Sequence, residues 1–114
     1  MIDKEAVLVL LKQILAARPQ LKDTIRSSRE FLFGVIARIY ILDEMRREFA
    51  FEREEISVLF DSLLEPEFIH IPDKRLQRFF EQIMAASKEV VKEEAFRQAV
   101  AAALLEAVKN KGAY

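Results

Sequence analysis

The chain has 114 residues, of which 52% are apolar and 32% are charged, and it contains 2 glycines and 3 prolines. This composition excludes a disordered chain, because it holds enough apolar side chains to offset the entropy that is lost on ordering. A chain of this length buries roughly 65% of the surface that its unfolded form exposes. We therefore expect a single domain over residues 1–114, with a core that needs neither disulfides nor a metal ion.

The charges are almost balanced, with 18 basic and 19 acidic residues and a net charge of −1. A protein that binds a nucleic-acid duplex usually carries an excess of basic residues, which is absent here. Any contact with nucleic acid therefore requires a local basic patch, or a patch that partner subunits complete.

Cysteine is absent, which excludes disulfides, thiolate catalysis and thiolate zinc sites and is compatible with a reducing cytoplasm. The charged run Asp3-Lys4-Glu5 follows Met1 and Ile2, and no small-residue cleavage site closes the apolar stretch 6–11, so we expect no signal peptide. No apolar run reaches the ~18 residues of a membrane span. These features predict a soluble, cytoplasmic protein without membrane contact.

Good helix formers dominate the chain and hairpin turn signals are missing, which predicts an all-α fold. We expect a compact helical bundle of about five helices with no sheet. The first helix is expected over residues 4–17, capped by Asp3 and ended by Pro19. Residues 20–26 fit either a connector or an extra helical turn.

The second expected helix, residues 28–49, begins at a capping box formed by Ser27 and Glu30. Its stretch 31–42 is apolar almost all the way round and is interrupted only by Arg38. A helix that is apolar on every side is normally buried, so this pattern predicts the central helix of the bundle.

A segment bounded by Pro66 and Pro72 separates the third expected helix from the fourth. The third is expected over residues 52–64, and a loop over residues 66–72 lays its apolar side chains against the bundle. Asp73 caps the fourth, and an alanine-rich fifth ends near Asn110 with Gly112 as its stop. The fourth and fifth either break near residues 87–88 or run on as one helix. The expected core consists of Phe31, Leu32, Val35, Ile36, Ile39, Leu59, Phe60, Phe79, Phe80 and Ile83.

The sequence holds little that resembles catalytic chemistry. His70 is the only histidine and lies in an expected loop, so the helical Glu-x-x-His pattern of di-iron bundles is absent. His70 fits a loop residue with a local hydrogen bond better than a ligand or general base. The carboxylates in stretches 43–55 and 93–94 lie among basic residues at helical spacing, which is typical of solvated faces with ion pairs. No nucleophile motif or phosphate loop is present. We predict no enzyme activity, no cofactor, no metal and no small-molecule substrate.

Two groups of basic residues are candidate contacts for nucleic acid. The first occupies the opening turns of the fourth helix: Lys74, Arg75 and Arg78. Cations at a helix N-terminus oppose the helix dipole, so their presence there favours an anionic partner, and we expect their removal to leave folding nearly unchanged. The second group is spaced by four, four and three residues and would form one stripe if helical: Arg18, Lys22, Arg26 and Arg29. Ordinary solvated helix faces are the alternative for both groups.

The first helix has apolar side chains on all sides over residues 6–11. A small bundle does not bury every side of two helices, so Val7, Leu8 and Leu11 are candidate contacts with other protein subunits or with copies of the same chain. The alternative is a helix enclosed within its own bundle.

Two segments resemble a known family. Residues 30–42, EFLFGVIARIYIL, are similar to the helix that opens the C-terminal helical region of large Cascade subunits in some type I CRISPR systems, where an aromatic/aliphatic–Gly–aliphatic core precedes a basic residue. Residues 71–83, IPDKRLQRFFEQI, resemble a later basic amphipathic helix of those proteins, and also small subunits of type III complexes. The resemblance spans roughly residues 30–84, and the balanced charge differs from the clearer basic face of many small subunits.

The resemblance implies a non-catalytic small subunit of an RNA-guided interference complex. Several copies would contact neighbouring subunits and the backbone of guide RNA, target DNA or the displaced strand, while base pairing reads the sequence. The alternative is a protein-interaction bundle, such as an adaptor or a viral or plasmid accessory protein, with no nucleic-acid contact.

Overall fold

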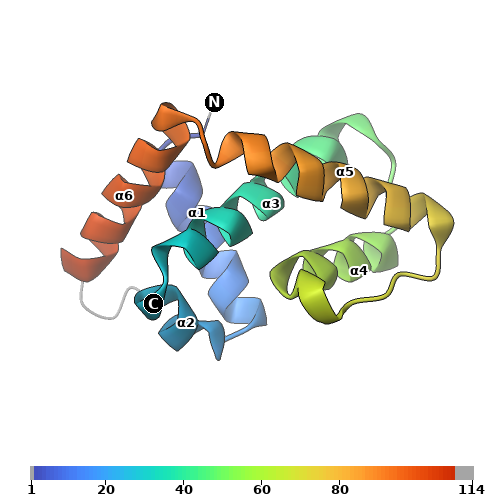
Figure 1. Ribbon diagram of the computed structural model, residues 1–114, viewed down its shortest axis with the longest axis horizontal. Coiled ribbons are helices and arrows are strands. Elements are labelled where there is room, and N and C mark those ends of the chain that lie inside the picture. Colours follow the sequence, from blue (N-terminus) through green and yellow to red (C-terminus); the bar gives the residue numbers. More distant parts are fainter. Residues whose placement is uncertain (1, 110–114) are drawn as a thin grey trace.

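The computed structural model of the protein describes residues 2–109, apart from the side chains of residues 25–27, 68, 108 and 109. Over these residues the chain forms six α-helices, one short 3-10 helix and no strand (Figure 1). Their bounds are α1 Lys4–Ala17, α2 Leu21–Ser27, α3 Arg29–Glu48, α4 Arg53–Leu64, η1 Pro66–Phe68, α5 Lys74–Val90 and α6 Glu94–Lys109. The predicted all-α bundle is confirmed. The expected stop at Gly112 lies outside the described residues.

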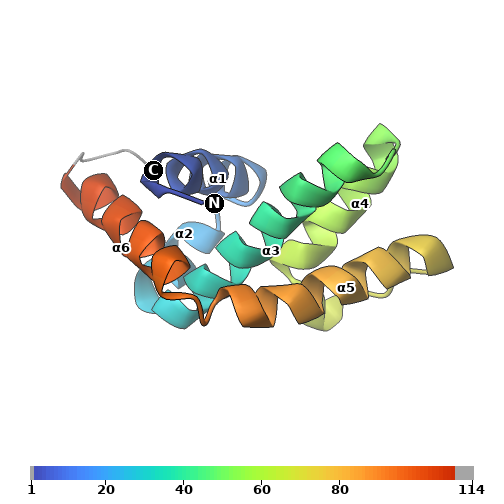
Figure 2. The same cartoon turned by 90° about the horizontal axis from the view of Figure 1, so that it is seen from above.

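Helix α3 forms the centre of a molecule that measures 43 × 28 × 22 Å. Figures 1 and 2 show α4 and α5 beside one half of α3 and α1, α2 and α6 beside the other half. In the first group α3, α4 and α5 all pack against one another, and in the second α1 packs on both α3 and α6. Burial of α3 on several sides confirms its prediction as the central helix: Leu32, Phe33, Val35, Ile36, Ala37, Ile39, Ile41 and Leu42.

Short-range capping determines where several helices begin. The Asp3 carboxylate accepts a hydrogen bond of 2.9 Å from the Ala6 amide, and the Asp73 carboxylate accepts from two amides at the start of α5. The predicted cap at Ser27 is wrong by one residue. Ser27 completes α2, whereas the backbone of Ser28 is extended and its hydroxyl accepts from the Phe31 amide at 3.2 Å.

The uncertain segments of the sequence also acquire definite structure. Residues 20–26 lie mainly in helix α2, which follows a turn at Pro19. Of the two alternatives for the fourth and fifth expected helices, the structure shows separate helices, but the break lies over residues 91–93 and not near residues 87–88. Helix α5 continues because the Val91 amide still donates to the Ser87 carbonyl at 3.1 Å. After it, Arg97 donates to the Val91 carbonyl at 3.0 Å, which satisfies a carbonyl at the turn into α6.

The core contains most of the expected residues, but not all of them to the same depth. Leu32, Val35, Ile36, Ile39, Leu59 and Ile83 are buried. Four expected phenylalanines are only half-buried and pack against the edge of the core: Phe31, Phe60, Phe79 and Phe80. Much of the remaining core comes from α1 and α6, where Ile14, Phe96 and Val100 are at most 1% exposed.

Arg38, the single polar interruption in the apolar stretch of α3, has a structural role. Its Nε donates a hydrogen bond of 2.8 Å to the carbonyl of Leu63 in the last turn of α4. That carbonyl has no later helical amide to accept from, so Arg38 replaces the missing donor. Burial lowers the pKa of Arg38, and the carboxylate of Glu67 acts against this shift.

Candidate nucleic-acid interface

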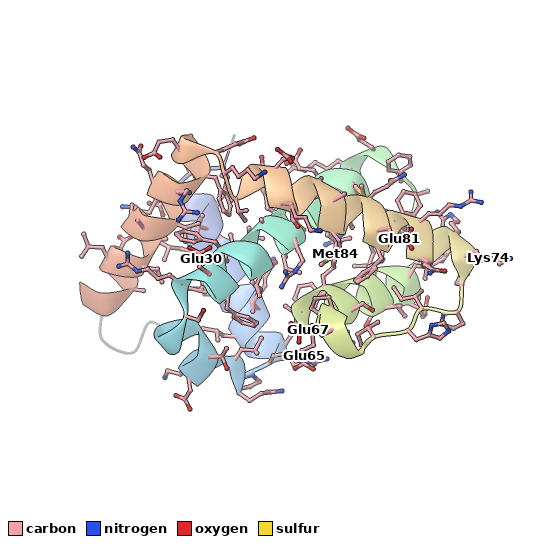
Figure 3. All side chains as sticks on the ribbon, viewed as in Figure 1. Glu30, Glu65, Glu67, Lys74, Glu81 and Met84 are labelled. Atoms are coloured by element: carbon pink, nitrogen blue, oxygen red, sulfur yellow. The ribbon has the colours of Figure 1, made fainter. Side chains whose placement is uncertain are left out.

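The starts of α4 and α5 and the end of α3 meet at one end of the molecule (Figure 1). We name this region the arginine-rich end and define it by Arg46, Phe51, Arg53, Lys74, Arg75 and Arg78. Lys74 lies at its tip, far from Glu30 in the opposite half (Figure 3). Its basic residues come from three segments that the sequence separates.

Arg75 is bound within the protein. Its guanidinium forms an ion pair with Glu55 and donates a hydrogen bond of 3.0 Å to the carbonyl of Ala50. The guanidinium carbon also lies 5.3 Å from the ring centroid of Phe51 and 5.4 Å from that of Phe79. These distances are those of cation–π contacts. These contacts join α5 to the α3–α4 connection, so we now expect the removal of Arg75 to lower stability, unlike the removal of an exposed cation.

Three phenylalanines extend this contact between helices. The Phe51 and Phe79 rings meet edge to face with centroids 4.9 Å apart, and Phe49 approaches Phe79 at 5.0 Å. Edge-to-face pairs at these distances are favourable. Phe49 remains 44% exposed, so the aromatic cluster reaches the protein surface.

The other two residues of the first predicted group, Lys74 and Arg78, are exposed. Together with exposed Arg53 at the start of α4, they form no ion pair or side-chain hydrogen bond with any residue that the structure describes. Each therefore presents a full positive charge to solvent. The structure thus divides the predicted group into one internal contact, Arg75, and two exposed cations.

A hollow of about 350 Å³ lies at the arginine-rich end and is lined by Arg46, Phe51, Arg53 and Ile56. A second hollow of about 390 Å³ shares Arg46 and is also lined by Gln13, Asp43 and Arg47. Arg46 and Asp43 form a long ion pair of 3.7 Å. Burial raises the pKa of Asp43 above its ordinary value, and Arg46 and Arg47 counteract that shift.

Arg46, Phe51 and Arg53 are not among the predicted site residues, because the arginines of this stretch fit ion pairs on a solvated face. That interpretation is correct for Arg46 and Arg47, which pair with residues three positions earlier at 3.7 and 3.5 Å. Arg53 is exposed, as expected of a solvated face, but it forms no ion pair with any residue that the structure describes. The available signal was the aromatic pair in RREFAFER, residues 46–53, because aromatic side chains between arginines are common where single strands bind.

The predicted stripe of Arg18, Lys22, Arg26 and Arg29 is wrong, because these residues do not share one helix. Arg18 follows the end of α1 and pairs with Asp61 at 3.3 Å and with Glu65 at 4.0 Å. Lys22 is half-buried on α2, Arg29 is exposed at the start of α3, and the side chain of Arg26 lies outside the described residues. The turn near Pro19 and the extended Ser28 interrupt the helical spacing.

The predicted interface on the first helix also requires correction. Val7 and Leu11 are only 1% and 2% exposed, because α3 and α6 cover this side of α1, and Leu8 is half-buried. Val7 and Leu11 therefore belong to the internal core, the alternative that the sequence left open. The large apolar side chain that α1 exposes is Val9, at 56%.

Other candidate sites gain no support from the geometry. His70 is exposed in the loop before α5, and within residues 2–109 no three or more His, Asp or Glu side chains are placed to hold a metal ion. Across the same residues, none of the helices has the length and apolar character of a membrane span.

The chain was compared with protein-family models, curated proteins and solved structures. No protein-family model matches the chain, and no curated protein or solved structure is significantly similar to it.

Proposed function

We propose that this chain is a non-catalytic helical subunit that contacts the phosphate backbone of single-stranded nucleic acid through its arginine-rich end. The observation that carries the proposal is the grouping of unpaired cations there. Arg53, Lys74 and Arg78 are exposed and have no partner among the described residues, and Arg46 lies beside them with one long ion pair. Exposed guanidinium and ammonium groups bind phosphate oxygens without reading the base sequence.

The charge balance determines how strong this contact is. Exposed carboxylates at the start of α4, Glu52 and Glu54, lie near the cations and repel a densely charged duplex. The isolated chain therefore binds weakly and in a strongly salt-dependent manner. Neighbouring subunits that extend the basic surface strengthen the contact.

A small subunit of an RNA-guided (CRISPR) interference complex fits these properties. Residues 71–83, which resemble a helix of such subunits, contain Lys74 and Arg78 at the start of α5. In such a complex base pairing supplies sequence recognition, and a small subunit needs only to bridge its neighbours and hold the strand. The proposal therefore implies two kinds of partner: neighbouring protein subunits, and the guide or target strand.

The test removes the two exposed cations of α5 and leaves Arg75 in place. The double variant Lys74→Gln/Arg78→Gln should flatten the log–log salt dependence of single-strand binding by about 1.4, because each phosphate contact contributes about 0.7. A matched control, Lys12→Gln/Lys88→Gln, removes the same charge from exposed positions elsewhere on α1 and α5. Binding is measured by fluorescence anisotropy across a salt series, alone and in the assembled complex.

Equal slopes in the two double variants contradict a contact at the arginine-rich end. Absence of binding by the wild-type chain, both alone and with its partners, favours the protein-interaction bundle instead. That second candidate has its own support, because Val9 and Leu105 are 56% and 59% exposed on two helices that pack against each other, α1 and α6.

A further inference from the structure

The hollow between α3 and α4 combines two kinds of lining, cationic and apolar. Arg46 and Arg53 supply two guanidinium groups, and Phe51 and Ile56 supply apolar surface. Arg46 forms one long ion pair, of 3.7 Å, with Asp43, and Arg53 has no partner among the residues that the structure describes. A ligand with one anionic part and one flat apolar part matches this lining.

We infer that this hollow binds one nucleotide unit of a single strand, with its phosphate between Arg46 and Arg53 and its base against Phe51 and Ile56. The inference rests on the proposed function and specifies the substrate class at the same end of the molecule. A guanidinium group presents donors in a fixed fork that matches phosphate oxygens, and two such groups can hold one phosphate from two sides.

The apolar side of the hollow is held in place before any ligand arrives. The Phe51 ring is fixed by the Phe79 ring at 4.9 Å and by the Arg75 guanidinium at 5.3 Å. Arg75 is itself anchored to Glu55 and to the Ala50 carbonyl. A preorganised ring loses little freedom on binding, and stacking on it tolerates every base because every base has a flat face.

The size of the hollow restricts what enters it. A volume of about 350 Å³ lies at the lower end of the roughly 300–1,000 Å³ that is common for small-ligand pockets. It suits a single nucleotide unit. In a duplex the bases are stacked and paired inside the helix, so only a strand with an unpaired base can occupy the hollow.

The experiment measures binding of the full chain to three oligonucleotides of equal length: a single strand, the same strand with abasic sites, and a duplex. The variants are Arg53→Gln and Phe51→Leu, and the controls are Lys12→Gln and Phe49→Leu. Lys12 is an exposed cation on α1, and Phe49 is an exposed ring that does not line the hollow. Thermal melting of each variant reports whether the fold is retained.

We expect Arg53→Gln to flatten the salt slope by about 0.7, and Lys12→Gln to leave it unchanged. Phe51→Leu should weaken binding of the base-containing strand by about 5-fold or more, with no change in slope. Wild-type protein should bind the abasic strand more weakly by the same factor, and Phe51→Leu should cause no further loss on that strand. The comparison of the intact and abasic strands uses wild-type protein alone, so a loss of stability in a variant does not affect it.

An equal affinity of wild-type protein for the intact and abasic strands overturns the inference, as does an equal loss from Phe49→Leu and Phe51→Leu. If the salt slope still depends on Lys74 and Arg78 in that case, the proposed function stands without the nucleotide site. Competition by free mononucleotide supports a site for the unit itself. If an acidic peptide of equal charge displaces the single strand as well as the mononucleotide does, the base contributes nothing, and this result counts against the nucleotide site.

Discussion

The two halves of the molecule pack against the same central helix with different kinds of side chain. On the α1–α6 side most of the contact is aliphatic and alanine-rich, and its one aromatic pair, Phe33 and Phe96, is buried. Residues such as Ile14, Val100 and Ala103 are fully buried there. On the α4–α5 side the edge of the core is aromatic and only half-buried, and an arginine, Arg75, lies against two of its rings. The first half is a closed core, whereas the second keeps aromatic and cationic groups at the surface.

The charges differ between the two halves in a corresponding way. On the α1–α6 side, ion pairs join neighbouring helices, with Lys4 at 3.4 Å from Glu106 and Arg97 at 3.5 Å from Glu30. Arg97 also lies 4.3 Å from the centroid of the Phe33 ring. At the arginine-rich end Arg75 also pairs across helices, with Glu55, but Arg53, Lys74 and Arg78 form no ion pair among the described residues. The net charge of −1 thus averages over two unlike surfaces, and it does not describe the surface that a ligand meets.

The largest effect should come from the closed core. Phe96 on α6 is 1% exposed and packs near Phe33 with ring centroids 6.3 Å apart. The change Phe96→Ala leaves a cavity that the surrounding helices fill only in part, so it should cost roughly 3–5 kcal/mol of unfolding free energy. Urea denaturation of wild type and variant measures this loss of unfolding free energy. Leu105→Ala, a change at a 59% exposed position of the same helix, is the control and should stay within about 0.5 kcal/mol. Similar losses in both would mean that α6 is not packed as described.

An intermediate effect is expected at the arginine-rich end. Arg75→Ala removes two cation–π contacts, a hydrogen bond and an ion pair, and about half of the side chain is exposed, so solvent weakens the electrostatic part. We expect a loss of roughly 1–3 kcal/mol. Arg75→Lys should recover little of it, because an ammonium group does not reproduce the planar guanidinium contacts. Arg78→Ala is the matched control, and equal thermal stability of the Arg75→Ala and Arg78→Ala variants would show that Arg75 is only a surface charge.

The smallest effect concerns pH. Burial raises the pKa of Asp43 in the folded chain, so the folded state binds this proton more tightly than the unfolded state does. Stability from this group is therefore fully present below the unfolded pKa and is lost as the pH rises through the higher folded pKa. The difference in urea midpoint between wild type and Asp43→Asn should change with pH over that window, in the direction that favours the variant at the higher pH. If the difference in urea midpoint between wild type and Asp43→Asn does not change with pH, the raised pKa of Asp43 is contradicted.

The sequence by itself determined the features that depend on residues close along the chain. Asp3 and Asp73 cap helices because each carboxylate reaches amides two or three residues ahead. Pro19 ends α1 for an equally local reason, and the unbroken apolar character of residues 31–42 was sufficient to predict a central helix. Capping preference alone did not distinguish Ser27 from Ser28, because either serine can cap and the extent of α2 decided between them.

Tertiary structure decided which surfaces and charges remain free. Val7 and Leu11 are buried by α6, whose residues follow them by most of the length of the chain, and no local pattern reveals that cover. Arg75 and Arg53 both lie near helix starts. Arg75 contacts Glu55 and Ala50, which precede it by 20 and 25 residues. Arg53 is exposed and has no partner among the described residues. Periodicity indicates which face a residue occupies on its own helix. What lies opposite that face depends on the packing of helices that are distant in sequence, and this packing assembled the hollow at the arginine-rich end.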